Sequence, residues 1–154
     1  CRYGGHTRVP YSVAQHSVLV CLLLQHEGAP IHVLRAALLH DAAEAYLGDV
    51  ISPLKQLLPE YKALEARWEA CIWQRFGVAL SPAEWSRIKV ADQRTYAGEQ
   101  FHLRGISLES MNAHADPTLF SRAWPVARPE CWSPTVAEIN FKQRWRHLEA
   151  GNTF

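Results

Sequence analysis

Residues 38–49 read LLHDAAEAYLGD, a leucine- and alanine-rich stretch that four ionisable side chains interrupt: His40, Asp41, Glu44 and Asp49. Leucine and alanine at this density favour a helix that is buried in the protein. An ionisable group buried without a partner costs on the order of several kcal/mol. We therefore expect these side chains either to pair with other groups or to bind a metal ion.

Helix signals recur before and after this stretch. A capping-box pattern at Ser12 and Gln15 begins a helix that is predicted over 13–26. A second helix is predicted over 30–47, because a proline suits its first turn and Gly48 suits its end. The quoted stretch then forms the last turns of this second helix.

The rest of the chain continues the helical pattern. We predict a short helix or turn at 52–55, an amphipathic helix from 59 to a stop at 77, and a last helix over 134–148. A second capping-box pattern, at Ser81 and Glu84, begins a helix that is predicted to reach 103 or 105. Several prolines predict irregular structure between 106 and 133. No run of alternating or β-branched residues predicts a strand. The predicted fold class is all-α, a compact helical bundle in a single domain over 1–154.

Size and composition restrict the class of protein. The chain has 154 residues, of which 48% are hydrophobic, enough for one continuous core. Its longest apolar run is far shorter than the roughly 20 residues of a membrane helix, so no membrane partner is expected. The formal net charge of +1 gives no generally basic surface, so extended nucleic-acid binding is not expected either.

Cysteine usage indicates a reducing compartment. The four cysteines, at positions 1, 21, 71 and 131, lie far apart without a C-x-x-C pair, and no secretory signal is visible. We expect core thiols in a cytoplasmic protein rather than a disulfide framework. Residue 1 is cysteine rather than methionine, and a further segment is expected upstream of it.

Three of the ionisable residues in the quoted stretch share one side of the predicted helix, and Asp49 follows just past its end. Each residue advances by about 100°, so His40, Asp41 and Glu44 project from a common arc. Ala37 and Gly48 border that arc with little bulk, which leaves room for an ion, a water and a ligand. Imidazole and carboxylate together suit Mn, Fe, Co, Ni or Zn. Two adjacent residues cannot complete the coordination of such a metal.

His16 and Asp92 are the natural third and fourth ligands. Each is a polar residue on an otherwise core-like helix surface. Each also has an ordinary alternative: His16 as a hydrogen-bonded core histidine, and Asp92 as an aspartate paired with Lys89 one turn earlier.

Five segments in this order resemble the HD superfamily of metal-dependent phosphohydrolases. They are YSVAQHS at 11–17, HDAAEAYLGD at 40–49, SPLK at 52–55, EYKALE at 60–65 and AD at 91–92. The resemblance covers about 1–105 and is greatest to bacterial 5′-deoxynucleotidases and related deoxynucleotide triphosphohydrolases. It implies a helical bundle of the HD-domain type and one essential divalent transition metal, Mn, Co, Fe, Ni or Zn, held by His16, His40, Asp41 and Asp92.

The resemblance also implies roles for the residues around the metal. Glu44 and Asp49 are expected to handle the attacking water and its protons. The expected substrate contacts are Arg2 for a phosphate, Tyr3 for a base or sugar, and, mainly because of their charge, Lys55 and Lys62 for further phosphate contacts. A homodimer or higher homo-oligomer is a further expectation.

The predicted function is hydrolysis of deoxynucleotides, most simply a 5′-deoxynucleotidase that releases phosphate from monophosphates. One alternative is a triphosphohydrolase that releases triphosphate, with additional Mg on the substrate. Another is a nucleotide- or metal-binding domain without catalysis. HD-type oxygenases need extra histidines between 41 and 92, and that interval contains none. No glycine-rich phosphate loop or G-x-S-x-G motif offers a different chemistry.

Overall fold

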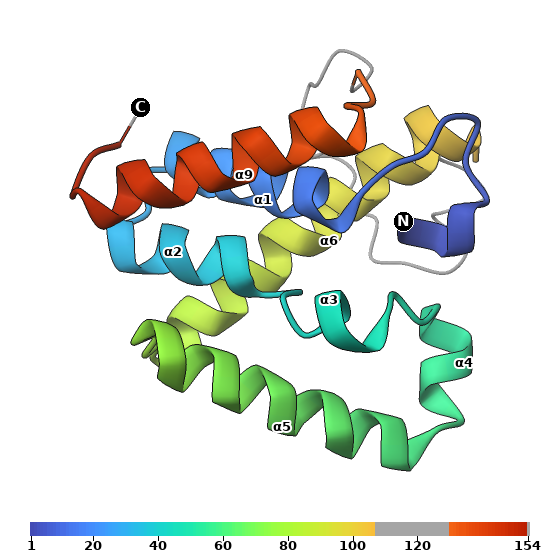
Figure 1. Ribbon diagram of the computed structural model, residues 1–154, viewed down its shortest axis with the longest axis horizontal. Helices are drawn as coiled ribbons and strands as arrows, with labels where there is room; N and C mark the ends of the chain where they lie inside the picture. Colours follow the sequence, from blue (N-terminus) through green and yellow to red (C-terminus); the bar gives the residue numbers. More distant parts are fainter. Residues whose placement is uncertain (107–129, 154) are drawn as a thin grey trace.

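The computed structural model describes residues 1–106 and 130–153, which contain helices and no strand. The elements, labelled as in Figure 1, are η1 (Arg2–Gly5), α1 (Val13–His26), α2 (Ile31–Leu39), α3 (Glu44–Leu47), α4 (Ser52–Gln56), α5 (Pro59–Phe76), α6 (Pro82–Arg104) and α9 (Pro134–Glu149). The predicted all-α class and compact shape are confirmed for this part of the chain. Most of the predicted irregular region between 106 and 133 lies outside the described residues.

Helix α1 is the centre of the fold. It packs against α2, α6 and α9, and α9 also contacts α2 (Figure 1). Helix α5 lies at the edge, beside α2 and the short α4. No helix of the described residues is long and apolar enough to cross a membrane.

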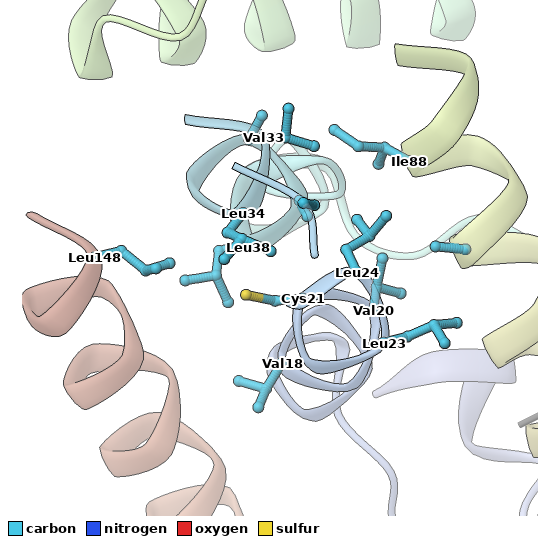
Figure 2. Packing of buried hydrophobic residues seen from close by; sticks show 14 residues of the cluster. Val18, Val20, Cys21, Leu23, Leu24, Val33, Leu34, Leu38, Ile88 and Leu148 are labelled. Atoms are coloured by element: carbon cyan, nitrogen blue, oxygen red, sulfur yellow. The ribbon is translucent and has the colours of Figure 1, made fainter. Parts of the chain in front are cut away.

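The main hydrophobic core forms where these helices meet (Figure 2). Leu24 of α1, Leu34 and Leu38 of α2, Ile88 of α6 and Leu148 of α9 are each at most 1% exposed. A helix at the centre of a bundle is apolar on most of its circumference, and α1 has this property through its LVCLLL run. The core therefore fixes α1 and α6 side by side, and these two helices carry His16 and Asp92.

The predicted second helix is broken, which corrects the continuous helix expected over 30–47. Helix α2 ends at Leu39, and α3 begins only at Glu44. Between them the chain makes tighter turns, in which the amide of Glu44 donates to the carbonyl of Asp41 at 3.0 Å. The His40 ring contributes to the break, because its Nδ1 donates to the Ala37 carbonyl at 2.7 Å and so competes with the helical backbone.

The two predicted capping boxes have different outcomes. At Ser81, both reciprocal bonds with Glu84 are present, and the prediction is confirmed. At Ser12, the hydroxyl accepts from the Gln15 amide as predicted, but the Gln15 side chain does not return the bond. It is buried and pairs instead with the segment before α9, where it donates to the Glu130 carbonyl at 2.7 Å. Its Oε1 also accepts from the Trp132 amide at 2.9 Å, so the buried glutamine has a partner at both ends of its amide group.

The cysteines are only partly core residues. Cys21 is buried, whereas Cys1 and Cys71 are exposed and Cys131 is partly exposed. The prediction of core thiols is thus wrong for Cys1 and Cys71. Cys71 is exposed because α5 lies at the edge of the fold, where Ile72 is the one buried residue along Pro59–Phe76.

Candidate metal centre

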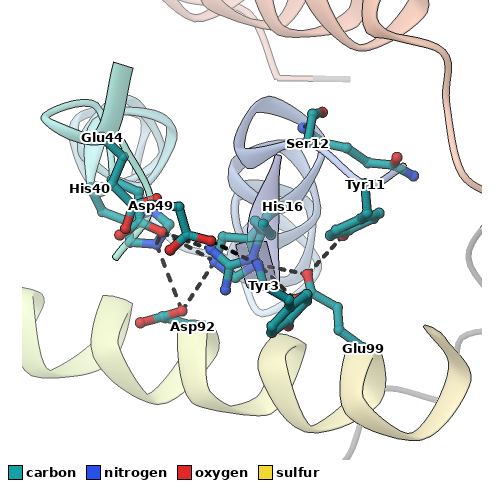
Figure 3. A network of polar contacts seen from close by, with 12 residues as sticks. Tyr3, Tyr11, Ser12, His16, His40, Glu44, Asp49, Asp92 and Glu99 are labelled. Carbon is teal, nitrogen blue, oxygen red and sulfur yellow. Dashed lines mark hydrogen bonds and ion pairs between the residues drawn. The ribbon is translucent and has the colours of Figure 1, made fainter. Parts of the chain in front are cut away.

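His16, His40, Asp41 and Asp92 form one cluster in the structure. Each offers a ligand atom, and the four atoms lie within 4.8 Å of one another. The side chains come from α1, from the turn after α2 and from α6 (Figure 3). This group can hold a metal ion, as the sequence predicted.

The spacing of the ligand atoms suits a metal of transition-metal size. Nε2 of His16 lies 3.1 Å from Oδ1 of Asp92 and 3.6 Å from Oδ2 of Asp41. Nε2 of His40 lies 3.3 Å from Oδ2 of Asp41 and 3.8 Å from Oδ1 of Asp92. Ligands at about 2.0–2.1 Å from a metal are about 3.4 Å apart in a tetrahedral site. The observed separations lie on both sides of that value.

His40 provides a second observation that fits a metal ligand. Its imidazole is fully buried, and Nε2 makes no hydrogen bond with any described residue. Its Nδ1 is already used by the Ala37 carbonyl. Because a buried polar atom is normally satisfied, an imidazole nitrogen left over beside two carboxylates fits a metal ligand.

Electrostatics in the cluster oppose the cost of burial. Burial alone would raise the pKa of Asp41 and Asp92, but the neighbouring imidazoles hold both below the usual range. Burial alone would lower the pKa of His40, but Asp41 and Asp92 raise it to about 10. The carboxylates therefore stay ionised beside cations, and a metal cation can replace the imidazole protons.

Glu44 lies beside the cluster with a nearly buried carboxylate. Its side chain is 8% exposed, and Oε2 is buried without a hydrogen bond from the described residues. Oε1 is 3.9 Å from Nζ of Lys55. Burial, with Asp41 and Asp49 nearby, raises the pKa of Glu44 to about 7. A carboxylate with that pKa can accept or donate a proton near neutral pH.

Asp49 has a partner that the sequence did not reveal. Its Oδ2 accepts a hydrogen bond from the Tyr3 backbone amide at 2.8 Å. The carboxylate faces the same cavity as Glu44 and also anchors the N-terminal segment over it.

Arg2 and Tyr3 form part of the wall of this cavity. Arg2 is buried, and its Nη1 donates to Oδ2 of Asp41 at 3.1 Å. The cavity measures about 630 Å³, and its lining includes Arg2, Tyr3, Glu44, Asp49, Lys55 and Asp92. This volume lies within the range of small-molecule sites, about 300–1,000 Å³.

The two predicted lysines are placed differently. Lys55 lines the cavity and donates to Glu65 at 2.6 Å. Lys62 is exposed on α5 and is not among the described residues that line the cavity. The structure thus brings Lys55, but not Lys62, to the site.

Sequence reasoning missed Glu99, which lies 1% exposed behind His16. Its Oε1 accepts from Nδ1 of His16 and from the Tyr11 hydroxyl, each at 2.7 Å. Burial would raise the pKa of this carboxyl, but His16 and Arg2 outweigh burial and lower it. One signal was available: Glu99 follows Asp92 by seven residues, which places both on one face of a helix.

The chain is similar to two curated proteins. Uncharacterized protein YfdR of Escherichia coli (strain K12) is 43% identical over 100 residues, which are 65% of this chain and 52% of the relative. Uncharacterized protein RCAP_rcc00048 of Rhodobacter capsulatus is 39% identical over 132 residues, which are 81% of this chain and 65% of the relative. The chain thus spans less than two thirds of either relative. A scan against protein-family models finds no match.

Proposed function

We propose that the chain is an HD-type, metal-dependent phosphohydrolase of deoxynucleotides. The observation that carries the proposal is the cluster of two histidines and two aspartates, which opens through Asp41 and Asp92 onto a cavity with Glu44 in its wall. The ordered HD-type segments of the sequence support the same reading. The leading substrate is a deoxynucleoside 5′-monophosphate.

The metal would be held by His16, His40, Asp41 and Asp92. When bound there, a divalent transition metal would supply Lewis-acid chemistry to a phosphoryl oxygen and to the attacking water. Glu44 accepts the proton of the attacking water, because its carboxylate is nearly buried and has a pKa of about 7.

The cavity also offers charges and rings to a nucleotide. The Arg2 guanidinium has further donors besides the one it gives to Asp41, and these can balance negative charge on the phosphoryl group. Lys55 adds a second cation beside Glu44. The rings of Tyr3 and Tyr96 lie 6.1 Å apart in the cavity wall, where they can contact a base or a sugar.

Product analysis tests the proposal directly. The protein is loaded separately with Mn, Co, Mg or Zn and incubated with deoxynucleoside mono- or triphosphates, and phosphate, pyrophosphate and triphosphate are resolved. Phosphate from monophosphates alone supports the 5′-deoxynucleotidase. Triphosphate with free nucleoside supports the triphosphohydrolase instead. No product under any of these conditions overturns the hydrolase and leaves a binding domain.

Two variants separate catalysis from metal binding. We expect Glu44→Gln to reduce hydrolysis by about 10²-fold or more while the metal content stays unchanged. Asp41→Ala is expected to lose both metal and activity. Glu60→Gln, on the exposed start of α5, is the matched control and should change neither. Full activity in Glu44→Gln would exclude Glu44 as the proton acceptor.

A cytoplasmic location belongs to the same proposal. Cys1 and Cys71 are free thiols, and both are exposed. Exposed free thiols persist in a reducing compartment.

A further inference from the structure

The Glu99 carboxylate connects the cluster of two histidines and two aspartates to the wall of the cavity (Figure 3). One oxygen, Oε1, accepts from Nδ1 of His16 and from the Tyr11 hydroxyl, each at 2.7 Å. The other oxygen, Oε2, accepts from the Tyr3 hydroxyl and lies 3.4 Å from Nε of Arg2. The side chain itself is 1% exposed, so four protein groups take the place of water around it.

The first oxygen decides which nitrogen of His16 is free. A carboxylate only accepts, so Nδ1 of His16 donates to Glu99, and Nε2 donates to Oδ1 of Asp92 at 3.1 Å. When a metal cation replaces the proton on Nε2, Glu99 keeps the remaining proton on Nδ1, and the lone pair of Nε2 would be directed to the ion. Carboxylates that hold metal-bound histidines in this way raise the basicity of the imidazole and fix its orientation.

The second oxygen holds the N-terminal segment over the cavity. Tyr3 has φ 60° and ψ 26°, a left-handed conformation that is uncommon for a residue with a side chain. Such a conformation persists where surrounding contacts impose it. The Tyr3 hydroxyl is fixed by Glu99, and its backbone amide is fixed by Asp49. The neighbouring Arg2 reaches Asp41.

We propose that Glu99 is a positioning residue with two functions: it orients His16 as an Nε2 ligand, and it fixes Arg2 and Tyr3 in the wall of the cavity. Metal affinity and the geometry of the substrate wall therefore depend on one buried carboxylate. The first function, orienting His16, is inferred from the geometry of the cluster alone. The second, fixing Arg2 and Tyr3 for a substrate, rests on the proposed function.

Metal titration tests the first half without any substrate. The metal-free full chain is titrated with Co(II), and the visible absorption of the bound ion gives both a Kd and a coordination spectrum. We expect Glu99→Gln to raise the Kd about 10–100-fold and to change the spectrum, because the amide nitrogen introduces a donor where Glu99 had only acceptors. An unchanged Kd and spectrum in this variant would overturn the inference.

Tyr11→Phe is the matched control. It removes one hydrogen bond from the same carboxylate and is equally buried, but it leaves the bond between His16 and Glu99 in place. We expect a lower melting temperature and an unchanged Kd for Co(II). If Tyr11→Phe weakens Co(II) binding as much as Glu99→Gln, the effect is general destabilisation and the positioning role fails.

A measurement on the unaltered chain covers the case in which Glu99→Gln does not fold. In the protein loaded with diamagnetic Zn(II), ¹⁵N spectra of the histidine side chains report which nitrogen carries the proton. We expect His16 to carry it on Nδ1, with slow exchange because the ring is buried. A proton on Nε2, or a Nδ1 proton that exchanges rapidly, would overturn the inference.

Tyr3→Phe isolates the substrate half. It removes a hydrogen bond to Glu99 but leaves His16 untouched. We expect unchanged Co(II) binding and a higher KM for the nucleotide. An unchanged KM would show that Glu99 does not position Tyr3 for the substrate. The absence of hydrolysis in the unaltered chain would instead overturn the proposed function, and the result of the metal titration would still hold.

Discussion

Each imidazole in the cluster is held at Nδ1 and directs Nε2 towards the two aspartates. Nδ1 of His40 donates to the Ala37 carbonyl, and Nδ1 of His16 donates to Glu99, both at 2.7 Å. A carbonyl or a carboxylate can only accept, so both rings are directed to present Nε2. Two histidines that are both held at Nδ1, one by a carbonyl and one by a carboxylate, have the arrangement typical of metal-binding histidines.

The aspartates differ in role, and a pair of isosteric changes tests this difference. Asp92→Asn keeps the shape of a ligand but removes its charge, so we expect the Kd for Co(II) to rise by more than about tenfold. Asp49→Asn, which alters a carboxylate bound to the Tyr3 amide, should leave that Kd unchanged. Titration of both variants under the same conditions checks the prediction. An equal rise in the Kd for Co(II) in both variants would place Asp49 among the ligands.

Cys21 should be much less reactive than the exposed Cys71. Burial raises the pKa of the Cys21 thiol to about 12. At pH 8 only about one such thiol in ten thousand is ionised, and the thiolate is the reactive form. We expect iodoacetamide to modify Cys71 in the folded protein and Cys21 only after denaturation, as measured by peptide mass spectrometry. Equally rapid modification of Cys21 would contradict its placement in the core.

At the scale of elements, helix type was predictable but helix continuity was not. The 38–49 stretch is rich in leucine and alanine, so its pattern predicts a helix that continues past Leu39. The helix ends there instead, and the His40 ring, which bonds back to the Ala37 carbonyl, contributes to the break. Likewise, Ser12 and Gln15 have the spacing of a capping box, yet a distant segment captures the glutamine. Local patterns therefore predict where a helix starts more reliably than they predict which distant group a side chain bonds to.

The Ser81 cap should make a measurable contribution to stability. Its hydroxyl accepts from the Glu84 amide at 3.3 Å and begins the longest described helix, α6. We expect Ser81→Ala to lower the free energy of unfolding by about 1 kcal/mol. Ser86→Ala, an exposed serine on the same helix, is the control and should be neutral or slightly stabilising. Urea denaturation measures both, and equal effects would show that the cap contributes nothing.

The same capping box predicts a pH dependence. The Ser81 amide and hydroxyl, followed by His32, lower the pKa of Glu84 from 4.5 to about 2. A folded pKa below the unfolded one stabilises the protein above the unfolded value, and this contribution is lost as the pH falls through about 2. The difference in unfolding free energy between the unaltered chain and Glu84→Gln should therefore shrink as the pH falls below 4.5. A difference that stays constant with pH would contradict this assignment.

At the scale of the whole molecule, the site depends on contacts between distant parts of the sequence. His40 and Asp41 are adjacent, and their place in the cluster was predictable from the chain alone. The role of Glu99 was not, because its partners Tyr11 and Tyr3 lie 88 and 96 positions away. Packing of α1 against α6 brings His16 to Glu99, and the segment before α1 adds Tyr3 and Tyr11. The ligands could be proposed from sequence, whereas the residues that orient them required the fold.

Because the ligands come from α1, α6 and the turn after α2, metal binding should stabilise the whole fold. An unfolded chain does not hold His16, His40 and Asp92 together, so the ion binds mainly the native state. At a free metal concentration about 100 times the Kd, the gain is about 2.7 kcal/mol, or about 5–10 °C in Tm for a chain of this size. We expect EDTA to lower the Tm by a similar amount, as followed by circular dichroism at 222 nm. Asp92→Asn should show a much smaller shift under the same conditions, because it has lost a ligand. If the unaltered chain melts at the same temperature with Co(II), Mn(II), Zn(II) and EDTA, the cluster is a set of structural ion pairs, and these carboxylates and imidazoles stabilise the interior by pairing with one another.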